Sequence, residues 1–100
     1  MWQAREEVSR EAALDHWRGL HVRLVEQVPG VKRYVQDVCA RGPDGSEPPY
    51  AGVGELWFDD IEAAKASLET PEWRAVIEDA STFMALDHVT AAWVEEHPIF

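Results

Sequence analysis

The chain has a single cysteine, Cys39, and no long apolar run among its 100 residues. One cysteine excludes an internal disulfide and a cysteine-rich metal cluster. No apolar run approaches the roughly 20 residues that a membrane-spanning helix requires. Residues 1–7 also lack the apolar stretch of a secretory signal. We therefore expect a soluble, cytoplasmic protein with no membrane partner.

Basic side chains are scarce, because 9 lysines and arginines stand against 19 acidic residues, for a formal net charge of -10. Such a surface repels a phosphate backbone, so nucleic-acid binding is not expected. The sequence has no glycine-rich phosphate loop, no nucleophile elbow and no flavin or nicotinamide fingerprint. Among its four histidines, His16 and His21 lie about 140° apart on a helix rather than on one face. We predict neither a metal nor a cofactor.

The sequence is 46% hydrophobic, which is typical of a globular protein, and its length of 100 residues predicts a single domain spanning residues 1–100. Its clearest element is a helix that begins after the N-cap residue Ser9 and ends at Pro29-Gly30. Gly19 lies inside this helix and costs about 1 kcal/mol relative to alanine. One stripe at helical spacing is expected to face the core: Leu14, Trp17, Leu20, His21, Leu24, Val25 and Val28.

The later elements follow from β-forming residues, turn residues and helix caps. They are a strand at 31–41, a turn-rich loop at 42–49, a strand at 51–58, helices at 61–68 and 71–79, a connection at 80–85 and a strand at 86–95. A short first strand at 1–6 would complete the order βαββαβ. The sequence therefore predicts an α+β fold of the ferredoxin-like type, with a four-stranded antiparallel sheet.

His21 is the first candidate for chemistry, because it lies on the apolar stripe and has two ring nitrogens to satisfy. It is either a core histidine that is hydrogen-bonded for packing or a general acid or base in a cleft between helix and sheet. Glu55 is its candidate partner, since it shares one face of a strand with Trp57. If that face points inward, Glu55 is paired or protonated; if it points outward, Glu55 is an ordinary surface residue.

Aromatic residues are frequent, with five tryptophans in the chain. Each is explained by filling of the core or of an interface. Taken together, Trp17, Trp57 and Phe83 also suit the walls around a flat apolar ligand. Tyr34 is placed to donate a phenol hydrogen bond into the same space. His88, near the start of the last strand, either lines one end of that pocket or is a plain strand-edge residue.

Four segments together resemble the EthD family of the dimeric α/β-barrel superfamily. They are residues 16–21, 29–36, 54–58 and 79–83. The family strings run close to W-x-x-x-H, P-G-x-x-R-Y and E-L-W-F, and their order and spacing cover nearly the whole chain. The resemblance therefore identifies the chain as a single EthD-like domain.

The resemblance implies a homodimer in which the sheets of two ferredoxin-like subunits pair into an eight-stranded barrel. It also implies a ligand cleft between the helices and the sheet of each subunit. Relatives include a methylmuconolactone isomerase and polyketide decarboxylases, dehydratases and cyclases. A histidine at the position of His21 lines the cleft of isomerase-like relatives, and the resemblance extends to Glu55, Tyr34 and Trp57. Family members begin with a longer hydrophobic first strand than residues 1–6 provide.

We therefore expect a cofactor-free enzyme that acts on an aromatic, polyketide or lactone-type small molecule, as a cyclase, dehydratase, decarboxylase or isomerase. His21 would move a proton next to a carbonyl, Glu55 would orient His21, and Tyr34 would hydrogen-bond to the carbonyl. The substrate-contacting residues would be Trp17, Trp57, Phe83 and His88. The alternative is a non-catalytic binding or accessory protein on the same scaffold, and a haem-dependent oxidation ranks third.

Overall fold

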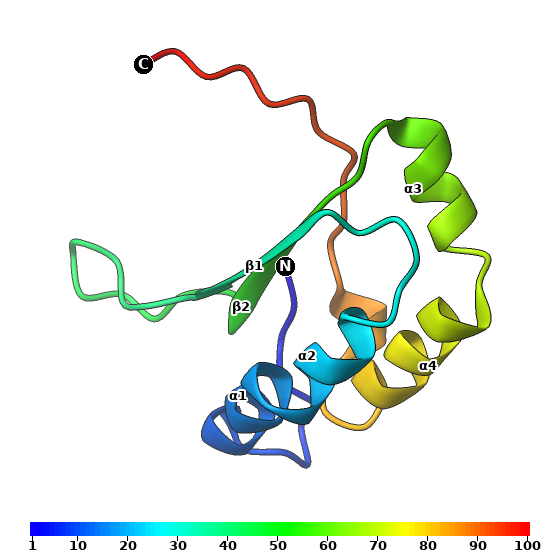
Figure 1. Cartoon of the computed structure of the whole chain (residues 1–100). Coiled ribbons are helices and arrows are strands. Elements are labelled where there is room, and N and C mark those ends of the chain that lie inside the picture. Colours follow the sequence, from blue (N-terminus) through cyan, green and yellow to red (C-terminus); the bar gives the residue numbers. More distant parts are fainter.

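The computed structural model describes residues 1–100 as a layer of helices against a short antiparallel sheet (Figure 1). Its elements are α1 (Arg10–Arg18), α2 (Leu20–Val25), β1 (Arg33–Val38), β2 (Gly52–Trp57), α3 (Ile61–Ser67), α4 (Pro71–Ala80) and the 3₁₀ turn η1 (Leu86–His88). The predicted cap at Ser9 is confirmed, because its side chain accepts a backbone N–H bond at the start of α1, and the side chains of Asp60 and Thr70 do the same for α3 and α4. None of the helices combines the length and hydropathy needed to cross a bilayer.

The first helical region is broken at Gly19, whose backbone angles are φ -104° and ψ -101°. The prediction of one continuous helix is therefore wrong. The Trp17 carbonyl, at the end of α1, accepts a hydrogen bond of 2.8 Å from the Gln36 side chain on β1. Because the break changes the helical phase, Leu20 turns outward and is 61% exposed, contrary to its predicted place in the core.

The sheet consists of β1 and β2, paired antiparallel from Arg33 opposite Trp57 to Val38 opposite Gly52. The two strands predicted on either side of the turn-rich loop are confirmed and form a hairpin, whose loop projects away from the helices (Figure 1). Isolated antiparallel bridges join Trp2 to Gly52 and Ala4 to Met84. The chain segments therefore lie in the order β1, β2, N-terminal segment and the segment after α4.

Two regular strands are present where four were predicted. The N-terminal segment makes isolated bridges instead of a regular strand, and the prediction of a strand at 86–95 is wrong. Residues 86–88 form η1, and the chain beyond runs away from the helices without regular structure (Figure 1). Trp93 and Val94 favour strand but are 56% and 85% exposed, so no burial offsets the entropy of ordering them.

The core lies between the helices and the helix-facing side of the sheet. Its larger cluster contains Trp2, Ala13, Leu14, Trp17, Ala51 and Phe83, and a second contains Val25, Val28 and Val76. The Trp17 ring lies so close to the sheet that a Cβ atom on Gly52 would come within 2.6 Å of it. Gly52 thus leaves the space that the indole occupies.

Candidate functional site

A cluster of two histidines and one carboxylate joins the first helical region to α4. His21, on α2, is 3% exposed, and its Nδ1 lies 2.8 Å from Asp79 Oδ2. His16, on α1, places its Nε2 2.9 Å from both oxygens of the same carboxylate. A continuous helix would hold the two imidazoles about 140° apart, so the break at Gly19 allows them to converge. The prediction that they do not share a face is therefore wrong.

These hydrogen bonds define which ring nitrogen carries the proton. An ionised carboxylate only accepts, so His21 Nδ1 and His16 Nε2 are the donors. In a neutral His21 ring, Nε2 then carries the lone pair and makes no hydrogen bond. This is the arrangement that a general base requires.

The electrostatics of the pair favour the same protonation state. Burial lowers the pKa of His21 below 6.5. The hydrogen bond and charge of Asp79 act to raise this pKa but offset the effect of burial only in part, and the charge of His16 lowers it further. Burial acts to raise the pKa of Asp79, but the hydrogen bonds and charges of His21 and His16 outweigh it and hold that pKa below 3.8. A neutral His21 therefore faces an ionised Asp79 at pH 7.

Phe83, in the connection after α4, closes one side of the cluster. Its ring centroid lies 4.8 Å from that of His16 and 5.2 Å from that of His21. Its edge-on contact with Trp2, at 5.5 Å, ties the ring into the larger core cluster. Phe83 thus packs the two imidazoles and keeps water from that side of His21. Its predicted contact with substrate stays a prediction.

Glu55, the predicted partner of His21, lies on the other face of the sheet. Its neighbour Leu56 pairs with Tyr34 and packs against the core. Because successive side chains of a strand point to opposite faces, Glu55 points away from the helices, and it is exposed. The predicted pairing is therefore wrong, and Asp79 takes that place. Trp57 shares the outer face, where the Arg33 guanidinium lies 4.5 Å above its ring.

Tyr34 faces the helices from β1. Its hydroxyl oxygen accepts a hydrogen bond of 2.9 Å from Gln36 Nε2, the same amide that donates to the Trp17 carbonyl. Burial raises the pKa of Tyr34, with the hydrogen bonds of Gln36 and Trp17 acting in the opposite sense, so the phenol keeps its proton at pH 7. With its oxygen occupied as an acceptor, the hydroxyl is left with a proton to donate.

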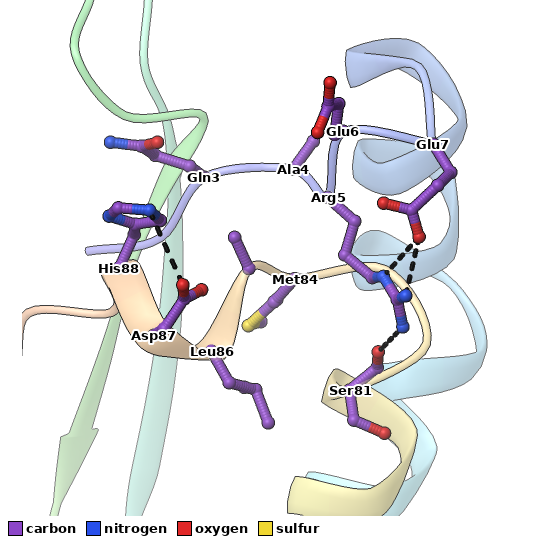
Figure 2. Close-up of a pocket in the computed structure, with 11 residues that line it drawn as sticks. Gln3, Ala4, Arg5, Glu6, Glu7, Ser81, Met84, Leu86, Asp87 and His88 are labelled. Carbon is purple, nitrogen blue, oxygen red and sulfur yellow. Dashed lines mark hydrogen bonds and ion pairs between the residues drawn. The ribbon is translucent and has the colours of Figure 1, made fainter.

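A separate hollow of about 600 Å³ lies between the N-terminal segment and the chain after α4 (Figure 2). Its lining is mainly polar and includes His88, as well as Arg5, which donates to the Ser81 carbonyl at 2.8 Å and pairs with Glu7 at 2.6 Å. Of the residues expected to contact substrate, His88 lines this hollow, whereas Trp17, Trp57 and Phe83 do not, and neither does His21. The histidine cluster and the hollow are therefore distinct features.

Asp79 is the functional candidate that sequence reasoning missed, although two signals pointed to it. It is the first residue of the 79–83 segment that carries the family resemblance. It also stands between Val76 and Ala80, which are both buried on the inner face of α4. A carboxylate on an apolar stripe needs a partner, by the same argument that singled out His21.

Comparison with known proteins agrees with this fold. The model of the EthD domain matches residues 5–87. An uncharacterized 11.0 kDa protein of the thcB-thcC intergenic region of Rhodococcus erythropolis is 32% identical over 89 residues, which cover 88% of this chain and 84% of the relative. The crystal structure of an ethyl tert-butyl ether D (EthD) family protein from Bacillus halodurans C-125 is similar, with a TM-score of 0.73 and 22% identity over 85% of this chain and 82% of that one.

The class that these features define is a small α+β domain whose helices cover one face of an antiparallel sheet. Within that class the chain belongs to the EthD family, as its four sequence segments predicted.

Proposed function

We propose that this EthD-family protein is an acid/base enzyme that acts, without a cofactor, on a small aromatic, polyketide or lactone-type carbonyl compound. The observation that carries the proposal is the buried pair of His21 and Asp79, in which the carboxylate holds His21 Nδ1 and Nε2 is the ring nitrogen with the lone pair. Such a pair orients an imidazole for proton transfer at Nε2 and stabilises the imidazolium that results.

The proposed reaction begins when His21 Nε2 removes a proton next to the carbonyl of the substrate. The electrons of the broken C–H bond form an enolate, and Tyr34 donates its hydroxyl proton in a hydrogen bond to the enolate oxygen. The imidazolium then returns its proton to another carbon, to a departing hydroxyl group, or to the alkoxide formed when the enolate attacks a second carbonyl. These outcomes correspond to isomerisation, dehydration and cyclisation, and each restores neutral His21.

Incubation with a panel of aromatic ketones, poly-β-ketones and unsaturated lactones in D₂O tests this proposal across all three substrate classes. We expect at least one compound to gain deuterium next to its carbonyl, or to form product, faster than in buffer alone. Mass spectrometry and proton NMR measure both outcomes. Compounds that raise the melting temperature but gain no deuterium and form no product would contradict the proposal.

That contrary outcome would favour a non-catalytic small-molecule-binding or accessory protein. The hollow beside Arg5 and His88 supports this second candidate, because it is large enough for a small molecule yet lies apart from His21. The two functions are separated by where a bound compound perturbs the NMR spectrum: next to His21 for the enzyme, next to His88 for the binding protein.

We also propose that the protein is a homodimer. Apolar side chains stand exposed near the C-terminus, among them Trp93, Val94, Ile99 and Phe100. A second copy of the chain would cover them and pair the two sheets into the barrel that the family resemblance implies. Sedimentation velocity at micromolar concentration is expected to give the dimer mass, and deletion of residues 91–100 is expected to shift it toward the monomer. A wild-type protein that sediments only as a monomer would contradict the proposal.

A further inference from the structure

We propose that His16 is a positioning residue, which fixes the Asp79 carboxylate so that Oδ2 holds the His21 ring with its proton on Nδ1. This inference deepens the proposed function, and it rests on that function only for its effect on rate. In a continuous helix His16 would lie off the apolar face that carries His21, and the sequence pattern gives it no catalytic or binding role.

The geometry gives His16 a distinct task at the carboxylate. Its Nε2 lies 2.9 Å from both Asp79 oxygens, whereas His21 Nδ1 reaches only Oδ2. The two imidazoles are the side-chain donors to Asp79, whose side chain is 19% exposed and therefore open to competing water. A donor that spans both oxygens opposes rotation of the carboxylate, and this rotation would carry Oδ2 away from His21.

His16 is itself held in place, so it can hold the carboxylate. Its ring packs against Phe83 at 4.8 Å, with the planes tilted by 48°. The turn at Gly19 brings α1 and α2 to the same side of α4, and Gly19 N–H bonds to the Asp15 and His16 carbonyls fix that turn at 3.0 and 3.3 Å. His16 also acts on His21 through its charge, which lowers the pKa of His21.

Two variants separate the effect of the His16–Asp79 hydrogen bond from the effect of packing the His16 ring against Phe83. In His16→Gln the side-chain amide can still donate to Asp79, whereas His16→Phe keeps a ring against Phe83 but has no donor. Long-range ¹H–¹⁵N spectra of the histidine rings measure the tautomer and the titration of His21 in each variant. We expect the wild-type tautomer ratio in His16→Gln, and in His16→Phe a rise of about 2- to 10-fold in the Nε2–H tautomer relative to Nδ1–H, the effect of one net hydrogen bond. Both variants lack the charge of His16, so the pKa of His21 should rise in both.

The inference is overturned if His16→Phe leaves the tautomer ratio of His21 unchanged, or if His16→Gln shifts that ratio as much as His16→Phe does. Circular dichroism checks that each variant is folded, and His16→Leu replaces His16→Phe if the latter is not. The spectra need no substrate, so they distinguish the two proposals. A protein with the expected tautomers that converts no compound would refute the proposed function and leave this inference intact.

Discussion

Gly52→Ala is expected to destabilise the fold by about 2–3 kcal/mol, the upper range for overpacking a core. The new Cβ would lie 2.6 and 2.7 Å from two ring atoms of Trp17 and 2.9 Å from Trp2 Nε1. Both indoles are buried in the larger core cluster, so neither can withdraw without displacing its neighbours. Thermal unfolding followed by circular dichroism should show a melting temperature lower by on the order of 10–20 °C.

Gly54→Ala is the matched control for this prediction, two residues along the same strand. Its Cβ would lie 3.6 Å from the Tyr34 ring and 3.7 Å from Trp17, which are ordinary van der Waals contacts. Alanine in a strand is favoured over glycine by roughly 0.5–1 kcal/mol, so this variant should match or slightly exceed the wild-type stability. Equal losses of stability in the two variants would mean that the close packing of Trp17 on Gly52 is not the cause of the destabilisation.

His21→Ala is expected to lower kcat/KM by about 10²- to 10⁴-fold on any compound that the wild-type protein converts, the range for losing a general base. Asp79→Asn should cause a loss in the same range, because its amide can donate to His21 Nδ1 and so favour the tautomer with the proton on Nε2. Initial rates at saturating and limiting substrate measure both effects. In the wild type the rate should fall only below pH 6.5, since the pKa of His21 is lowered from that value and the neutral ring is the reactive form.

His97→Ala controls for the loss of a histidine as such. His97 lies near the C-terminus with its side chain 76% exposed and pairs with Glu95, far along the chain from His21, so the variant should keep the wild-type rate. Full turnover in His21→Ala would refute the acid/base role. Equal losses in His21→Ala and His97→Ala would show that the rate depends on something other than the buried imidazole.

Much of the fold could be predicted from local signals. The caps at Ser9, Asp60 and Thr70 act on the residues that follow them, and the β1–β2 hairpin joins neighbouring segments, so sequence pattern alone locates them. The last strand could not be predicted correctly, because strand formation requires a partner and β-propensity does not supply one. Residues such as Trp93 are strand-formers with nothing against them in a single chain.

The candidate site was only half predictable for a related reason. His21 follows from periodicity, which is a local property of one helix. Its partner depends on how α2 packs against α4, and sequence pattern does not give that geometry. Glu55 is the one charge in the middle of an apolar strand, but the alternation of a strand does not say which of its faces is covered. A continuous helix places His16 off the face that carries His21, and the break at Gly19 removes that geometry.

The protonation state of His21 in the wild-type protein tests the central claim most directly. Long-range ¹H–¹⁵N correlation spectra recorded between pH 7 and 8 report which nitrogen of each histidine ring carries a proton. We predict that His21 is neutral, with its proton on Nδ1 toward Asp79 and an unprotonated Nε2, and that it titrates below pH 6.5. A His21 ring that carries its proton on Nε2, or that titrates above pH 6.5, would contradict this account.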